Sequence, residues 1–127
     1  MTILTEGART AEFLLSEAND WRSRDAAVVT VPANTTFEAG TILGQLAADD
    51  SFVRHDTDGT DDGRRTEAGV LYANLINETG SAVDVDATVI IRDAELNSAE
   101  LIYEAGADAN AITASNTALA ALGLIVR

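Results

Sequence analysis

The 127-residue chain carries 21 acidic and 8 basic side chains, giving a net charge of −13 at pH 7, and every base is an arginine. This charge would repel phosphate groups, so we expect neither nucleic acid nor an anionic membrane as a partner. Because 46% of the residues are hydrophobic and none is cysteine, the sequence predicts one folded domain without disulfides or thiolate metal sites.

The composition is also typical of salt-adapted proteins, because it combines many acids and 23 alanines with no lysine. In concentrated salt the Debye length falls to roughly 3 Å, which screens repulsion within so acidic a chain. A GC-rich coding bias, which favours Ala, Arg, Asp and Gly, is the competing explanation. A high-salt source is therefore a hypothesis, and it predicts that stability depends on salt concentration.

In the first half of the chain, the polar residues 1–12 predict an N-terminal arm. The β-branched run at 26–31 predicts a strand that ends at Pro32, because proline has no backbone N–H to donate. Residues 35–46 are interpreted as a strand, a turn and a returning strand. The polar stretch 49–66 predicts a short edge strand followed by an exposed loop.

In the second half, residues 70–76 predict a buried strand, and residues 82–92 predict the clearest strand because small apolar side chains alternate along it. Residues 93–101 are interpreted as a helical turn. A C-terminal helix is expected to begin at a cap among Ser115, Asn116 and Thr117 and to end at Gly123, before a last strand at 124–127. The predicted fold class is mainly β with a short C-terminal helix, a small α+β domain.

The residues that usually carry chemistry predict no catalytic, cofactor or metal site. His55 is the only histidine and stands in a polar loop, so we interpret it as a solvated residue. The loop 56–63 is similar to a calcium loop, but in the EF-hand register that begins at Asp58 the closing glutamate is replaced by Gly69. We therefore interpret this loop as a hydrophilic turn.

Trp21, Arg22 and Arg24 are the candidate interface residues of the chain. Tryptophan and arginine dominate the energetics of protein interfaces, and here three such residues lie within four positions. The alternative is a buried tryptophan flanked by two surface arginines that pair with acids.

Several short stretches, in order along nearly the whole chain, resemble the lambda-type phage head decoration proteins (head protein D). They are Thr5–Gly7, Glu12–Asn19, Arg22–Asp25, Ala39–Gly44, Val70–Ala73, Ile90–Asn97 and Leu119–Arg127. Each stretch is short, and the resemblance rests on their order. The chain departs from the family at Tyr103-Glu104, where Trp-Pro is expected, and in the more acidic loop 54–66.

This resemblance implies a β-clip fold with short bent strands, and a homotrimer on the outside of the expanded viral head at three-fold and quasi-three-fold sites. Residues 13–127 would form the decoration domain, and residues 1–12 an arm that orders on the major capsid protein. The capsid-binding residues would be Thr2, Ile3, Leu4, Thr5 and Glu6. The protein would lie on the virion after assembly in the host cytoplasm, stabilise the head against packaged DNA, and need no cofactor.

Two other classes of function remain as alternatives. A soluble β-clip module that binds a sugar or other ligand would need a concave pocket with converging polar groups. A hydrolase would need His55 to meet a serine and an acid in the folded chain.

Overall fold

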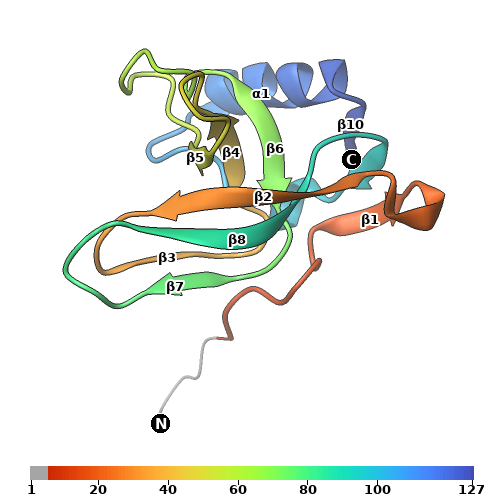
Figure 1. Cartoon of the computed structure of the whole chain (residues 1–127). Coiled ribbons are helices and arrows are strands. Elements are labelled where there is room, and N and C mark those ends of the chain that lie inside the picture. The colour runs from red at the N-terminus through yellow and green to blue at the C-terminus, as the bar shows by residue number, and fades with distance from the viewer. Residues whose placement is uncertain (1–5) are drawn as a thin grey trace, which may run out of the picture.

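The computed structural model describes residues 6–127 and confirms a mainly β fold with one C-terminal helix (Figure 1). Thr2, Ile3, Leu4 and Thr5 lie outside the described residues. The elements in chain order are β1 (Leu14–Glu17), the 3-10 helix η1 (Asn19–Trp21), β2 (Arg24–Val31), β3 (Thr35–Phe37), β4 (Ile42–Gln45), β5 (Phe52–Arg54), β6 (Glu67–Leu71), β7 (Leu75–Asn77), β8 (Val83–Ile90), β9 (Ala94–Leu96), the 3-10 helix η2 (Ser98–Glu100), α1 (Ala109–Ala121) and β10 (Leu124–Val126).

The centre of the fold is a closed barrel with the strand order β2-β5-β4-β6-β8. β2 and β8 pair antiparallel along their whole length, from Arg24 opposite Ile90 to Val31 opposite Val83. Because side chains alternate along a strand, Val29 and Val31 of β2 point into the barrel. They pack there with Phe37, Leu43, Phe52, Leu71 and Val89 in one hydrophobic cluster.

A second hydrophobic cluster lies between the barrel, α1 and a three-stranded sheet with the order β1-β9-β10. Phe13, which directly precedes β1, is fully buried in it together with Leu96, Leu119 and Leu124. In Figure 1, α1 lies on one side of the barrel, and the N-terminal segment leaves on the opposite side. No helix among the described residues is long and apolar enough to span a bilayer.

The predicted hairpin of residues 35–46 is wrong. β3 pairs antiparallel with β7, and β4 instead enters the barrel between β5 and β6. Gly40 explains the change of direction, because it has a φ of +96° and its backbone passes so close to Glu100 that a Cβ would lie 2.5 Å from that residue's carbonyl oxygen. The chain therefore leaves β3 at this point, and the apolar Ile42 and Leu43 are buried in separate clusters.

The polar stretch 49–66 also differs from its prediction. β5 is not an edge strand, because it pairs with β4 on one side and, in parallel, with β2 on the other. Phe52 and Val53 are both buried, which gives this short strand a place inside the barrel despite its polar surroundings.

The C-terminal helix exists, but its predicted start is wrong. α1 begins at Ala109, and its N-cap is Asp108, whose carboxylate accepts a hydrogen bond of 2.8 Å from the Ala111 N–H. Thr113 and Thr117 lie inside the helix, where each hydroxyl donates to the carbonyl four residues earlier. Residues 93–101 form β9 and η2, so only their second part is helical.

The predicted ends of β2 and α1 are confirmed. β2 stops at Val31, directly before Pro32, and Gly123 follows the end of α1 with a φ of +85°. In this left-handed conformation Gly123 reverses the chain into β10, which pairs parallel with β9.

We expect Gly123→Val to lower the free energy of unfolding by about 2 kcal/mol, because a β-branched residue is strained at positive φ. A Cβ at this position would also lie 3.2 Å from the Asp93 backbone nitrogen. Urea unfolding measures the change. Gly80→Val is the control, since a Cβ there meets no atom within 4 Å. Equal unfolding midpoints for the two variants would contradict this account of the helix end.

Candidate interaction surface and buried histidine cluster

Trp21 projects from the 3-10 turn η1, between β1 and β2, with 71% of its surface exposed. Asp20 and Trp21 both have positive φ angles, 62° and 56°, which are unfavourable for residues with a Cβ. Because most of the Trp21 surface is exposed, the alternative of a buried tryptophan is wrong. A large apolar side chain displayed on a strained turn is a feature that folding alone does not require.

The turn that carries Trp21 is held by charged contacts behind it. Glu17 accepts hydrogen bonds from the Ser23 hydroxyl at 2.8 Å and from Arg24 Nε at 3.0 Å. The guanidinium of Arg24 also lies 4.4 Å from the centre of the Tyr72 ring. The hydrogen bond from Arg24 holds the pKa of the Glu17 carboxyl below its usual value.

The three candidate interface residues therefore differ in their surroundings. Trp21 is exposed, and Arg22 is exposed while its guanidinium lies 3.3 Å from the Asp93 carboxylate. Arg24 is mostly buried and supports the turn. The arrangement leaves Trp21 and Arg22 on the surface, with Arg24 as the residue that positions them.

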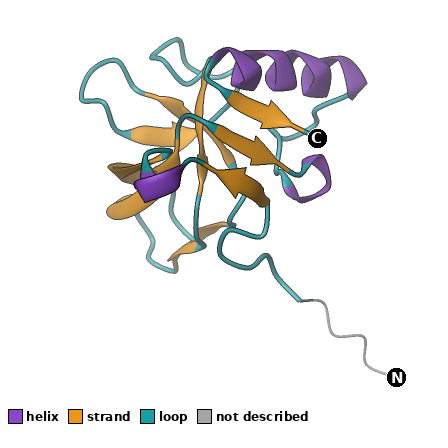
Figure 2. Cartoon of the chain, turned by 90° about the vertical axis from the view of Figure 1, so that its right-hand side faces the viewer, coloured by secondary structure: helices purple, strands orange, loops and turns teal. Residues whose placement is uncertain are grey.

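Two further apolar side chains are exposed on the sheet next to this turn, which Figure 2 shows with its three strands facing the viewer. Leu15 of β1 is 52% exposed and Ile125 of β10 is 40% exposed. The side chains of Leu96 and Leu124 in the same sheet are buried in the core. The outward face of this sheet is thus partly apolar.

The described part of the N-terminal segment is attached to the barrel beside the turn between β6 and β7. The Asn74 side chain donates to the Ala8 carbonyl at 2.7 Å, and the Ala11 N–H donates to the Tyr72 carbonyl at 2.9 Å. Glu6 is exposed and pairs with Arg9. Within residues 6–127, the hydrogen bonds between this segment and the domain body therefore begin at Ala8.

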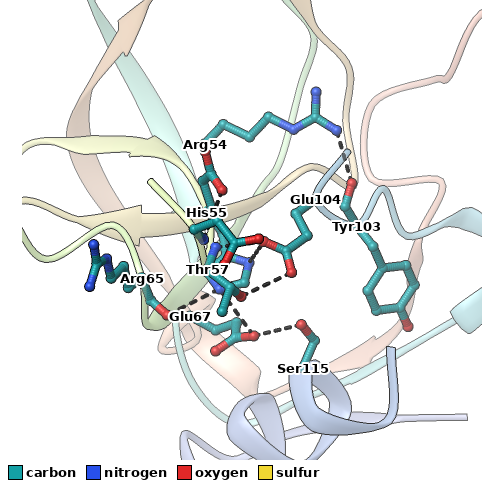
Figure 3. Close-up of polar contacts among 10 residues, drawn as sticks. Arg54, His55, Thr57, Arg65, Glu67, Tyr103, Glu104 and Ser115 are labelled. Carbon is teal, nitrogen blue, oxygen red and sulfur yellow. Dashed lines mark hydrogen bonds and ion pairs between the residues drawn. The ribbon is translucent and has the colours of Figure 1, made fainter. Parts of the chain in front are cut away.

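His55, interpreted from the sequence as solvated, is instead 99% buried, since only 1% of its surface is exposed (Figure 3). Its Nε2 lies 3.3 Å from both the Arg65 carbonyl oxygen and a Glu67 carboxylate oxygen. Both atoms are acceptors, so this nitrogen carries the ring hydrogen. Its Nδ1 lies 3.9 Å from Glu104, beyond hydrogen-bonding distance.

The residues around His55 join the loop 55–66 to the rest of the domain. Thr57 donates to Glu104 from its N–H at 2.6 Å and from its hydroxyl at 2.9 Å. Ser115 of α1 donates its hydroxyl hydrogen to Glu67. A Ser-His-acid triad needs serine to face the imidazole, and here serine faces the carboxylate. The cluster therefore has the geometry of a structural connection between α1, β6 and the loop.

The loop carboxylates are also engaged in contacts within the protein. Asp56 accepts from the Asp58 N–H at 3.1 Å, and Asp62 accepts from Arg64, whose hydrogen bond lowers the pKa of the Asp62 carboxyl. Within residues 6–127, no group of three or more His, Cys, Asp or Glu side chains has the arrangement of a metal site.

A comparison with protein families identifies the family of this chain. The family model described as bacteriophage lambda head decoration protein D matches residues 3–124, almost the whole chain. The chain belongs to this family. A comparison with curated proteins found no significant match. Membership implies a phage capsid decoration protein that associates with the head and is located on the virion, in a family of structural proteins.

As a head decoration protein, the chain is expected to present a surface for docking rather than a catalytic pocket. The sequence pointed to Trp21 and Arg22 but missed the buried cluster around His55. The one available signal was the position of His55 two residues after the apolar pair Phe52-Val53. The other members of the cluster, Glu67, Glu104 and Ser115, are 12 to 60 positions further along the chain, and only the folded domain brings them together.

We expect Glu17→Gln to lower the free energy of unfolding by about 1–2 kcal/mol at pH 7, because it weakens a charge-assisted hydrogen bond. The pKa of Glu17 is lower in the folded state, so its contribution is complete above the unfolded-state pKa of about 4.3 and is lost as the pH falls through the folded-state pKa. Urea unfolding from pH 7 into the acid range should show the two proteins converge.

The control for this series is Glu95→Gln. Glu95 pairs with Arg127 at the surface, where the side chains are 43% and 62% exposed, so its loss should change stability by less than about 1 kcal/mol. If the Glu17 and Glu95 variants lose the same stability at pH 7, the support assigned to Glu17 is absent.

Proposed function

We propose that this head decoration protein binds as a homotrimer on the outer surface of the expanded head, at three-fold and quasi-three-fold sites. There it would join neighbouring copies of the major capsid protein and stabilise the lattice against the pressure of packaged DNA. The match to the decoration family over residues 3–124 carries this proposal. The net charge of −13 supports it, because such a protein is repelled by the genome.

The N-terminal segment is the first proposed contact with the shell. Thr2, Ile3, Leu4 and Thr5 form a short β-capable run without proline, which suits pairing with an exposed strand edge, and Glu6 follows it. The hydrogen bond from Asn74 to the Ala8 carbonyl supports this division, because it holds the chain to the barrel directly after this part of the sequence. We assign the decoration domain to residues 13–127, beginning at the buried Phe13.

Binding through such segments is weak for one copy and strong for three. Ordering the backbone costs about 1–2 kcal/mol per residue, which offsets most of what one short strand gains. In a trimer, binding of the first segment holds the other two at high effective concentration near their sites. This multivalency is the physical reason for a trimeric decoration protein.

Trp21 and Arg22 form the second proposed contact with the shell. Trp21 offers a large exposed apolar surface, and the pair of Glu17 and Arg24 fixes the turn before binding. A preformed turn reduces the entropy that binding costs. The role of the protein would be mechanical, with no bond made or broken.

We expect deletion of residues 2–7 to leave the trimer intact and to abolish binding to undecorated expanded heads. The deletion ends before Ala8, so the hydrogen bonds of Ala8 and Ala11 to the barrel are kept. Analytical ultracentrifugation measures the oligomeric state, and co-sedimentation with heads measures binding. Wild-type binding by the shortened trimer would contradict the role of the segment, and a monomeric full-length protein would contradict the trimer.

We expect Trp21→Ala to weaken binding to heads at least tenfold without lowering stability, because the side chain is exposed in the free protein. Ile76→Ala is the matched control, since Ile76 is 65% exposed but lies in the sheet formed by β3 and β7. Co-sedimentation with undecorated heads compares the two variants. Equal affinities would remove Trp21 from the proposed contact.

A further inference from the structure

The barrel is closed by very little pairing between β2 and β5, and within residues 6–127 this leaves part of one edge of β2 without a neighbouring strand. β8 covers one edge of β2 over all eight residues, whereas β5 meets the other edge, within the described chain, at the single pair Val29 and Phe52. Among the strands of residues 6–127, none therefore lies beside the edge of β2 from Arg24 to Val28. Figure 1 shows β8 alongside β2 on one side and β5 on the other.

A groove with a volume of about 730 Å³ follows this edge. Four consecutive residues of β2, from Asp25 to Val28, line it. Consecutive side chains of a strand point to opposite faces, so four in a row border one groove only if the groove runs along the backbone edge itself. The groove thus exposes the main chain of β2.

The hydrogen-bond pattern shows which backbone groups point into the groove. The Ile91 N–H donates to the Ser23 carbonyl at 2.9 Å, so these two residues form a hydrogen-bonded pair between β2 and the extension of β8. Such pairs alternate along an antiparallel ladder. Asp25 and Ala27 therefore bond toward β8, and the N–H and C=O of Ala26 point away from it.

A contact of β8 supports the same alternation independently. Thr88 stands opposite Ala26, and its carbonyl accepts a hydrogen bond of 3.1 Å from the Tyr72 N–H on the far side of β8. The carbonyl of Thr88 is thus turned away from β2, as the pattern requires. Ala26 presents one donor and one acceptor to any strand that enters the groove.

The side chains of the groove favour a basic ligand with small residues. Ala27 and Ala68 leave room beside the edge, and the carboxylates of Asp49, Asp50 and Asp86 lie around it. The remaining acid, Asp25, is 3.2 Å from Arg92 and is partly neutralised. An extended segment with Lys or Arg side chains complements this charge.

A second copy of this chain is poorly suited to supply that segment. The arginines at 9, 22, 24, 64, 65, 92 and 127 each lie within 4.0 Å of an acidic side chain of their own chain. The eighth, Arg54, donates to the Tyr103 carbonyl at 2.9 Å. A second copy would therefore bring a strongly acidic surface to an acidic groove.

We propose that the edge of β2 from Arg24 to Val28 binds an extended basic segment of the capsid shell, which adds as a strand beside Ala26. This inference rests on the proposed function, because that function supplies the shell as partner. The edge begins two residues after the proposed shell contact of Trp21 and Arg22, so the two proposed contacts are neighbours along the chain. The protein and the shell would then exchange strands in both directions.

The first test neutralises the groove with Asp50→Asn and Asp86→Asn together. Asparagine suits residue 50, where φ is +61°. We expect at least a tenfold loss of affinity for undecorated expanded heads at low salt. The matched control is Asp58→Asn with Glu78→Gln, which makes the same charge change at exposed positions outside the groove and should alter affinity less than twofold. Equal losses in both pairs would show a general charge effect and overturn the proposal.

The second test addresses the backbone with Ala26→Pro, which removes the N–H that faces the groove, and with Ala26→Ser, which keeps it. We expect only the proline variant to lose affinity for heads, with unchanged melting of both. Hydrogen exchange of the wild-type protein gives the same information without a substitution. The Ala26 amide should exchange quickly in the free trimer and slowly on heads.

The outcomes separate this inference from the proposed function. If wild-type protein binds heads but the Ala26 amide exchanges equally with and without them, the strand addition is wrong while the decoration role stands. Protection of Ala26 already in the free trimer would assign the edge to a second copy and would also overturn the inference. If wild-type protein does not bind heads, the proposed function itself fails.

Discussion

The pairing of β2 with β8 is the interaction on which the rest of the structure depends. Its eight residue pairs fix which side chains of β2 enter the barrel, and they set the direction of the backbone groups on both edges. Both ends of β2 are also determined locally. Pro32 stops the strand at one end, and at the other Arg24 binds Glu17 and thereby forms the turn that exposes Trp21. One strand thus connects the barrel core, the strained turn and the unpaired edge.

The distribution of surface charge follows from the small number of arginines and from where the fold places them. A chain with 8 arginines and 21 acids has too few cations to neutralise its surface, and the structure uses each arginine in an internal contact. Arg24 supports the Trp21 turn, Arg92 holds Asp25, and Arg64 orders the loop through Asp62. The outer surface is left with unpaired carboxylates, which sets the sign of any partner that binds through charge.

The sequence predicted the features that are determined by residues close together in the chain. It missed the features that depend on contacts formed by the closed barrel. The end of β2 at Pro32 and the reversal at Gly123 are local backbone effects, and both were predicted correctly. The start of α1 was misplaced by seven to nine residues, because Asp108 is an equally good cap and the threonines lie inside the helix with their hydroxyls bonded to its own carbonyls. The burial of His55 was missed, because the residues around it, Glu67 and Glu104, come close only after β4 has paired with β5 on one side and β6 on the other.

The candidate interaction surface also combines features that the sequence predicts with one that depends on long-range contacts. Residue types alone selected Trp21 and Arg22, since tryptophan and arginine are frequent in interfaces, but they could not separate these from Arg24, whose role depends on Glu17 and Tyr72. Under the proposed function this separation has a mechanical meaning. Two contacts of moderate strength on each of three copies bind tightly only when all reach their sites together. Because Glu17 and Arg24 hold the Trp21 turn, three such turns in a trimer would lie at set distances from one another, and the trimer would recognise the spacing of the shell as well as its surface chemistry.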